Sequence, residues 1–322
     1  MLAPRVLFVK LSSLGDVIHH LPAVSDLATH RPGARIHWAV EEAYADLVTL
    51  HPAVELAVPV NLRRLRRSYL SPSAWKGFAA SRRSLARGGY DYVVDTQGLM
   101  KSATLARLAH SPCFGFDRAS AREPLAARLY DVKIAVPRSL HAVERNRRLV
   151  AEVFGYAVDS PPDYGLIAPD EPPAWAPAGP YVVAFHAASR AGKLWPGERW
   201  IALGGRLAAD GIATVFPGGN EAEREFAARL ASATPESVAA PAMTLVEVAA
   251  LVAHAEAVAG VDTGLTHLAV ALDCPAVGIY CATDPALTGL NGAGRVVNLG
   301  SPGEAPSVDA VAEALGIGPR PG

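Results

Sequence analysis

A carboxylate lies shortly after the first apolar run of the chain. Residues 6–9, Val-Leu-Phe-Val, have the composition of a short buried strand, and the pair Gly15-Asp16 follows before a new helical pattern begins. We therefore expect Asp16 at the carboxyl end of a strand. Open parallel sheets bind ligands in the crevice outside these strand ends, where a carboxylate can act as a general base. The alternative is that Asp16 only caps the following helix.

A turn near the end of the chain is suited to a phosphate. A predicted strand there gives way to a helix through Asp262, Thr263, Gly264 and Leu265. Unpaired N–H groups and the positive end of the helix dipole favour an anion at such a place. The spacing is not that of a P-loop, and the sequence contains no G-x-G-x-x-G. The alternative is an ordinary helix cap, and His267, one turn further on, is as consistent with a core position as with a ligand contact.

Residues 185–196 form a second polar loop after a predicted strand. Ser189 can donate a hydrogen bond to a phosphate, and Lys193 can meet it as a point charge. A single lysine in a loop is usually only solvated. Its place in the same predicted strand-end crevice as the Asp262 turn favours the phosphate role.

Two glycines follow a further strand within residues 216–224, and Glu223 is placed just inside the next helix. The carboxylate of Glu223 is suited to a ribose diol. A turn with a favourable carboxylate in the first helical turn explains the same residues, and locally it is the simpler interpretation.

Cationic side chains concentrate in the first half of the chain. Four arginines fall within residues 61–67, namely Arg63, Arg64, Arg66 and Arg67, and Lys101, Arg122 and His141 follow other apolar runs. Arginine pairs bidentately with phosphates and carboxylates, so an anionic acceptor is the simplest partner. Arginine-rich faces are also commonly just solvated, and this cluster suits lipid head groups as well.

Composition bounds the possible classes of protein. The 322 residues are 50% hydrophobic and 19% charged, which excludes a disordered chain, and the net charge of −1 gives no support to general nucleic-acid binding. The three cysteines form no C-x-x-C pair, so we expect incidental thiols. Lys10 ends the first apolar run too early for a signal-peptide core, and no stretch approaches the ~20 apolar residues of a membrane span.

Strand and helix patterns alternate, which predicts an α/β protein with two Rossmann-like, doubly wound parallel-sheet domains facing a central cleft. The first domain comprises residues 1–165, a proline-rich linker covers residues 166–180, and the second domain comprises residues 181–322. The predicted strands are 6–9, 35–40, 54–60, 92–95, 181–185, 212–216, 257–261 and 276–280. The predicted helices include one running to about residue 29, then 43–50, one between residues 60 and 92, one after Gly98, 199–210, 221–233, 265–272 and 308–315. We expect the last of these to pack back on the first domain.

Six segments, taken in order, resemble the lipopolysaccharide heptosyltransferases of glycosyltransferase family 9, and within that family the heptosyltransferase I branch. They are residues 10–19, 38–42, 95–102, 121–126, 141–145 and 261–268. Each is weak alone, and together they are specific and span nearly the whole chain. The resemblance implies a GT-B architecture and an inverting transfer of L-glycero-D-manno-heptose from ADP-L-glycero-β-D-manno-heptose to the Kdo of Kdo2-lipid A.

The resemblance also implies roles for individual residues. Asp16 would be the general base. The donor would be bound by Ser189, Lys193, Glu223, Asp262, Thr263, Gly264, Leu265 and His267, and the acceptor by Ser13, Gly15, Arg63, Arg64, Arg66, Arg67, Lys101, Arg122 and His141. One departure is Ala188, where the family has a hydroxyl residue, so one side-chain donor is missing.

Cationic donors and helix N–H groups can stabilise the leaving diphosphate, so no metal or other cofactor is required, and Mg²⁺ stimulation is compatible with this expectation. The same resemblance implies peripheral contact with the cytoplasmic face of a Gram-negative inner membrane and no nucleic-acid partner. Three alternatives remain open: a heptosyltransferase II, another GT-B transferase with a different acceptor or nucleotide sugar, and, with least support, a non-catalytic nucleotide- or sugar-binding protein.

Overall fold

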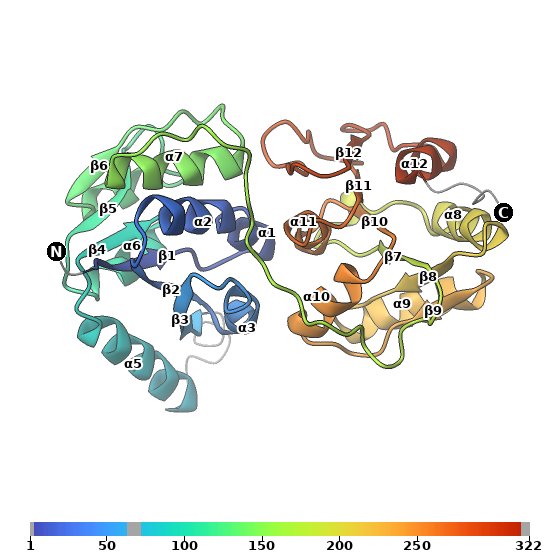
Figure 1. Ribbon diagram of the computed structural model, residues 1–322, viewed down its shortest axis with the longest axis horizontal. Helices are drawn as coiled ribbons and strands as arrows, with labels where there is room; N and C mark the ends of the chain where they lie inside the picture. The colour runs from blue at the N-terminus through green and yellow to red at the C-terminus, as the bar shows by residue number, and fades with distance from the viewer. Residues whose placement is uncertain (1–2, 63–71, 317–322) are drawn as a thin grey trace. The chain divides into compact units, whose positions relative to one another are not determined.

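Parallel strands form the framework of the computed structural model, which describes residues 3–62 and 72–316. The chain divides into two compact units, Met1–Ile167 and Ala168–Gly322. Each unit contains one six-stranded sheet in which neighbouring strands run parallel (Figure 1). The predicted fold class, α/β with two Rossmann-like parallel sheets, is confirmed.

The first unit places its strands in the order β3-β2-β1-β4-β5-β6. The strands are β1 (Arg5–Val9), β2 (Arg35–Glu41), β3 (Val54–Val60), β4 (Tyr92–Asp95), β5 (Cys113–Phe116) and β6 (Val132–Ile134). Its helices are α1 (Leu14–Ile18), α2 (Leu21–His30), η1 (Glu42–Tyr44), α3 (Ala45–Val48), α5 (Pro72–Arg87), α6 (Met100–Arg107), η2 (Pro124–Leu129) and α7 (Ala142–Phe154).

Strand β1 lies in the middle of this sheet and is covered on both faces. Leu7 and Val9 pack in one core cluster with Leu85 of α5 and Ala103 of α6. On the other face Phe8 meets the ring of His20 edge-on, next to α2, which packs against α7. A strand buried on both faces needs a continuous apolar run, which is why residues 6–9 contain no polar side chain.

The second unit repeats the design with the order β12-β11-β10-β7-β8-β9. Its strands are β7 (Tyr181–Phe185), β8 (Ala213–Phe216), β9 (Ser237–Ala239), β10 (Ala257–Val261), β11 (Ala276–Ile279) and β12 (Val296–Leu299). Its helices are η3 (Ala191–Lys193), α8 (Gly197–Ala209), α9 (Glu221–Ser232), α10 (Leu245–Ala253), α11 (Gly264–Ala271) and α12 (Val308–Leu315).

Both sheets have the same connectivity, because the chain builds outward from the first strand of each unit and then returns to its other side. In the first sheet the direction of building reverses between β1 and β4, and in the second between β7 and β10. Open α/β sheets bind ligands outside the carboxyl ends of the strands at such a switch point. The residues that follow these four strands are therefore the candidates for a functional site.

Several elements differ from the sequence prediction. The helix expected to run to about residue 29 is two helices, α1 and α2, which are separated at His19 and His20. Pro22 is the second residue of α2, and in one continuous helix its ring would clash with the carbonyl group of Ile18. The sequence prediction also missed four short strands and one helix, β5, β6, β9, β12 and α7.

The proline-rich stretch, residues 161–180, contains no helix or strand, as predicted. Helix α12 packs on α8 and on strands β10, β11 and β12 of its own unit, and its expected packing on the first domain stays a prediction. Within residues 3–62 and 72–316, no helix combines the length and apolar character needed to cross a membrane.

A buried ion pair joins α2 to α7. Arg147 binds both carboxylate oxygens of Asp26, with Nε–Oδ2 and Nη2–Oδ1 distances of 2.7 and 3.0 Å, and its Nη1 donates to the carbonyl group of Ser160. The two side chains are only 3% and 7% exposed. An ion pair of this kind becomes a large liability when one partner is removed, because the other charge stays buried.

We expect Arg147→Met to lower the free energy of unfolding by about 3–5 kcal/mol, because it leaves Asp26 buried without its partner. Arg148→Met is the matched control: Arg148 is the next residue on α7 and pairs with Glu144 while half exposed, so its loss should cost less than about 1 kcal/mol. Urea denaturation measures both. If both substitutions lower the free energy of unfolding equally, breaking the buried pair costs no more than breaking the exposed one, and the prediction is wrong.

Candidate functional site

Asp16 lies in the first turn of α1, just beyond the carboxyl end of β1. Its Oδ2 accepts hydrogen bonds from the backbone N–H and the hydroxyl group of Ser13, at 3.0 and 3.2 Å. The carboxylate therefore takes part in the helix cap, as the alternative interpretation of the sequence expected. Its side chain is still 26% exposed, so the same oxygens remain open to a ligand. These capping contacts hold Asp16 in place and leave its carboxylate able to accept a further hydrogen bond or a proton.

Cations surround this carboxylate. Arg122 Nη1 lies 3.3 and 3.2 Å from its two oxygens. Burial raises the pKa of Asp16, but the charges of Lys10 and Arg122, together with the hydrogen bonds from Ser13 and Arg122, outweigh burial and hold the pKa below its usual range. Asp16 is thus ionised at neutral pH, which is the protonation state that a general base requires.

Lys10 is a buried member of the site that the sequence analysis did not single out. It is 5% exposed, and burial lowers its pKa to about 8 although the charge of Asp16 raises it. Its Nζ donates to the carbonyl group of Thr96 at 2.8 Å and to Asn146 Oδ1 at 3.2 Å. Asn146 Nδ2 in turn donates to the carbonyl group of His19, at the end of α1. A polar network therefore fixes both ends of the segment that carries Asp16.

Gln97, which follows β4, is the second residue that the sequence analysis missed. Its amide bridges the loop before α1, accepting from the N–H of Leu11 at 2.7 Å and donating to the carbonyl group of Ser12 at 2.6 Å. Asp95 orients this turn by accepting from the N–H groups of Gln97 and Gly98. The available signal was a run of polar residues directly after a buried strand. Gln97 and Lys10 position Asp16 across the switch point.

The predicted acceptor residues are only partly brought together. Lys101 Nζ donates to Ser12 Oγ at 3.2 Å, Arg122 pairs with Asp16, and Ser13 and Gly15 belong to the same turn. His141 caps α7 by accepting from the N–H of Val143, and its ring lies 5.5 Å from that of His19. The remaining four, Arg63, Arg64, Arg66 and Arg67, lie outside the described residues.

In the second unit a cavity of about 180 Å³ opens at the carboxyl ends of β7, β8 and β10. Four of the predicted donor residues line it, namely Ser189, Glu223, Thr263 and Leu265. Beside it, Lys193 Nζ lies 2.6 Å from Asp262 Oδ2, which also accepts from the hydroxyl group of Thr283. Because an ammonium group has three N–H donors, Lys193 keeps two after pairing with Asp262.

Helix α11 begins at Gly264 at this same edge, and the first N–H groups of a helix have no partner within it. The lysine, the helix N-terminus and the cavity together could hold an anion, as the sequence analysis expected. His267 is not one of the described residues that line the cavity. It is buried within α11, where it is 5% exposed. Ala188 lines it with a methyl group, so its side chain offers no hydrogen bond.

Glu223 has a local structural role that its position in the sequence suggested. Its carboxylate accepts from the N–H of Gly219 at 2.8 Å and from the amide of Asn220 at 2.7 Å. Asn220 caps α9 in return. Glu223 also lines a larger neighbouring cavity of about 500 Å³, together with Ala188, Trp195 and Phe226. Each carboxylate oxygen has a second lone pair, so these contacts hold Glu223 in place and still leave it able to accept from a ligand.

Comparison with known proteins gives consistent results. The model of glycosyltransferase family 9 (heptosyltransferase) matches residues 78–315. Lipopolysaccharide heptosyltransferase 1 of Pseudomonas aeruginosa PAO1 is 42% identical over 302 residues, which cover 92% of this chain and 84% of that protein. The E. coli heptosyltransferase WaaC with ADP superposes with a TM-score of 0.89 at 40% identity, covering 96% and 98% of the two chains. WaaC with ADP-2-deoxy-2-fluoro heptose gives a TM-score of 0.86, with the same identity and coverage.

We expect Arg122→Gln to raise the pKa of Asp16, because the substitution removes one of the charges that lower it. A carboxyl-carbon NMR titration measures this directly. The lowered pKa of Asp16 also makes the stability of the fold depend on pH, in a direction that can be worked out. A lowered pKa stabilises the fold above the unfolded value of 3.8, and this stabilisation is lost as the pH falls through the lower folded value.

Arg122→Gln should therefore weaken the acid dependence of unfolding. Arg118→Gln, an exposed change four residues away, is the control and should leave the titration of Asp16 unchanged. An Asp16 pKa that is the same in wild type and Arg122→Gln would contradict the pairing.

Proposed function

The chain belongs to glycosyltransferase family 9, the heptosyltransferases, and from this premise we propose that it transfers heptose from ADP-heptose to the Kdo of Kdo2-lipid A in lipopolysaccharide core synthesis. The observation that carries the proposal is the pair of switch points: one holds a carboxylate among cations, and the other holds a lysine beside a helix N-terminus. The likeness to a curated heptosyltransferase 1 supports the first heptose transfer over the second.

We assign the donor to the second unit. Lys193 and the N–H groups at the start of α11 would meet the diphosphate, with Ser189 as a further donor and Glu223 on the ribose. Asp262 serves this site through Lys193. It holds the ammonium group in place, and the pairing neutralises a carboxylate that would otherwise repel a diphosphate.

Glycosyl transfer develops positive charge on the anomeric carbon and negative charge on the leaving diphosphate. In the proposed reaction Lys193 and the helix N–H groups stabilise the leaving charge, so that no metal or other cofactor is required. Asp16 removes the proton of the incoming Kdo hydroxyl. The hydroxyl oxygen bonds to the anomeric carbon as the bond to the diphosphate breaks, and the configuration at that carbon inverts.

The cations around Asp16 fit an acidic acceptor. Arg122 pairs with Asp16 while exposing half of its own side chain, at 51%. A carboxylate of the acceptor would compete for this guanidinium, and any loss of the Arg122–Asp16 contact raises the pKa of Asp16. Binding of the acceptor would thereby strengthen the base at the moment it is needed.

The proposed acceptor is linked to a lipid, so the reaction must take place at a membrane surface. We propose that the enzyme acts at the cytoplasmic face of the inner membrane as a peripheral protein.

The acceptor is tested by comparing two substrates. We expect transfer from ADP-heptose to Kdo2-lipid A, and little transfer to the product that already carries one heptose, when both are followed by mass spectrometry. Preference for the heptosylated acceptor would instead assign the second transfer of the pathway. Binding of ADP-heptose without turnover on either acceptor would favour a binding protein.

Asp16→Asn tests the base separately from the helix cap. An asparagine side-chain oxygen can still accept from the N–H of Ser13, but the amide cannot take up the proton of the acceptor. We expect kcat to fall by about 10²–10⁴, the usual contribution of a general base. ADP affinity should stay near wild type in calorimetric measurements, and thermal stability at neutral pH should fall because the carboxylate no longer pairs with Lys10 and Arg122.

Two further variants are compared with Asp16→Asn, one as a control and one as a test of the donor site. Asp46→Asn, an exposed change on α3, should leave kcat unchanged. Lys193→Ala should weaken ADP binding and lower kcat by about 10²–10³, the usual cost of losing one charge-stabilising donor. Ordinary turnover in Asp16→Asn would remove Asp16 from the chemistry.

A further inference from the structure

Helix α5 has one face in the core and one face outside. Ser81 and Leu85 are buried, and Phe78 packs against the same core cluster as strands β1 and β3. At 100° per residue these positions share one side of the helix. Five exposed residues of the helix, which we call the α5 outer face, are Trp75, Lys76, Arg82, Arg83 and Arg87. Lys76, Arg83 and Arg87 lie opposite the buried positions, and Trp75 and Arg82 lie along one flank.

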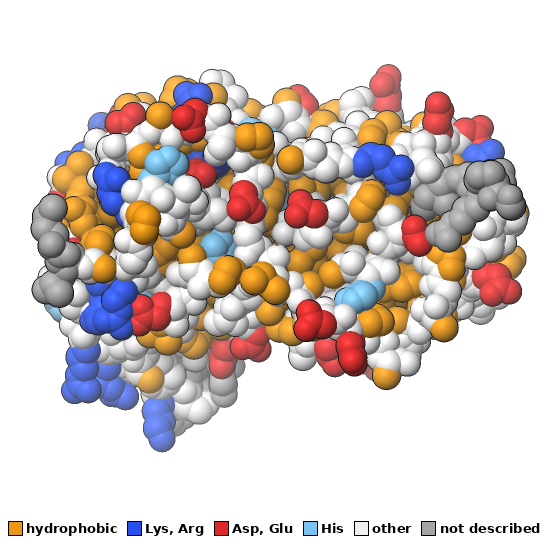
Figure 2. All heavy atoms as spheres, in the orientation of Figure 1, with side chains coloured by type: hydrophobic (Ala, Val, Ile, Leu, Met, Phe, Trp, Pro, Cys, Tyr) orange, Lys and Arg blue, Asp and Glu red, His pale blue; other side chains and the backbone are white. Residues whose placement is uncertain are grey.

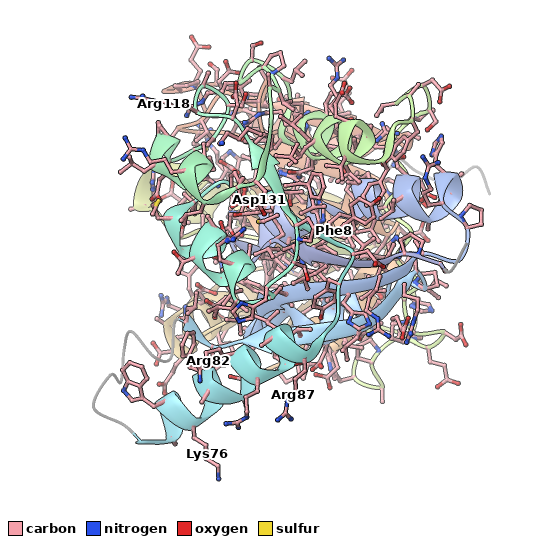
Figure 3. All side chains as sticks on the ribbon, turned by 90° about the vertical axis from the view of Figure 1, so that its left-hand side faces the viewer. Phe8, Lys76, Arg82, Arg87, Arg118 and Asp131 are labelled. Atoms are coloured by element: carbon pink, nitrogen blue, oxygen red, sulfur yellow. The ribbon has the colours of Figure 1, made fainter. Side chains whose placement is uncertain are left out.

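Figure 3 shows Lys76 and Arg87 projecting from α5 away from the sheet. In Figure 2, Lys and Arg side chains gather over the same helix. The sequence of α5 contains four cations and no carboxylate. This is a concentrated positive charge in a chain whose net charge is −1.

The α5 outer face differs from the other charged surfaces of the protein. Some exposed cations elsewhere are paired with neighbouring carboxylates, as in Arg35–Glu55, Arg107–Asp131 and Arg206–Asp309. None of the ion pairs found among residues 3–62 and 72–316 includes a cation of α5.

Its tryptophan is unusual as well. Trp75 is 52% exposed, whereas Trp38, Trp195 and Trp200 are at most 2% exposed. A large exposed indole beside unpaired cations is the composition of a helix that lies in a membrane interface.

We propose that the α5 outer face docks the protein on a bilayer surface rich in anionic lipids. The cations would meet lipid phosphates, and Trp75 would enter the interface between head groups and acyl chains. Each Lys or Arg near such a surface strengthens binding by about fivefold. Nucleic acid also presents phosphates, but the net charge of the chain gives it no long-range attraction to a polyanion, and a bilayer interface favours an exposed indole.

The direction of α5 suits this use. Helix α5 connects β3 to the parallel strand β4, so it starts at the carboxyl edge of the sheet and returns to the amino edge. Trp75 and Lys76, in its first turn, therefore lie toward the edge where Asp16 is found. On the proposed function, on which this step rests, docking through α5 brings that edge close to the head groups that carry the acceptor.

The test uses the full chain and vesicles without substrate. We expect it to sediment with vesicles of phosphatidylcholine and phosphatidylglycerol and not with phosphatidylcholine alone, and added salt should weaken binding. Arg82→Gln/Arg87→Gln should bind the mixed vesicles about thirtyfold more weakly, because it removes two cations. Arg128→Gln/Lys133→Gln changes the net charge equally at exposed positions of the same unit and should bind like wild type.

Trp75 gives an independent readout. Its fluorescence should shift to shorter wavelength on the mixed vesicles, and the shift should disappear in Trp75→Phe while sedimentation persists. Equal loss of binding in the two double variants would overturn the proposal, as would absence of binding to the mixed vesicles. The proposal would also be overturned if the Arg82→Gln/Arg87→Gln variant lost binding to an oligonucleotide but kept binding to the mixed vesicles.

Activity separates this proposal from the proposed function. On a deacylated, water-soluble Kdo acceptor the α5 variants should transfer heptose at the wild-type rate, and on vesicle-borne acceptor they should be slower. A wild-type protein that binds vesicles through α5 but transfers no heptose to either acceptor would refute the proposed function and leave the docking surface supported. Wild-type rates for the α5 variants on vesicle-borne acceptor would refute a role for α5 in reaching the substrate.

Discussion

The burial of the central strands on both faces is the constraint on which both units depend. Strand β1 has β2 and β4 as neighbours and helices on either face, and its four fully buried residues, 6–9, are all apolar. Polar groups accumulate beyond that end, from Lys10 to Asp16, and they meet those that follow β4. Strands β7 and β10 produce the same result in the second unit, with Lys193 and Asp262. The candidate residues therefore lie beyond the strand ends because the buried strands themselves exclude polar side chains.

A positioned carboxylate at such an edge needs support from distant parts of the sequence. The loop before Asp16 is held by Gln97, and the end of its helix is held by Asn146, more than a hundred residues away. Lys10 donates to Asn146 and to the carbonyl group of Thr96, the residue before Gln97, and it lowers the pKa of Asp16 by its charge. Buried polar groups that satisfy one another in this way are rigid, because any displacement leaves one of them without a partner. The geometry around Asp16 is therefore set before any substrate arrives.

This difference between local and distant interactions explains what the sequence could predict. Residues 54–60, 92–95, 181–185 and 257–261 are strands with the predicted bounds. Residues 181–185 and 257–261 are continuous apolar runs, which is the pattern of a strand buried on both faces. Strands β6 and β9 have only three residues each, at the outer edges of the sheets, too short to give a pattern. The pairing of Arg122 with Asp16 spans 106 positions and has no local signal. Local pattern identified Asp16, Lys193 and Asp262 as candidates, but only the fold supplies their partners.

The two switch points share strand order and differ in charge. At one, a carboxylate is held by the guanidinium group of Arg122, and at the other the ammonium group of Lys193 is held by a carboxylate. Each pair offsets its own charge while no substrate is bound, which reduces the cost of placing an ion at a partly buried edge. In the proposed reaction a carboxylate of the acceptor would compete with Asp16 for Arg122, which would make Asp16 a stronger base. At the other pair Asp262 would stay on Lys193, whose two remaining N–H donors would meet the leaving diphosphate. Ion pairs of opposite arrangement in two copies of the same sheet would therefore serve both halves of a group transfer.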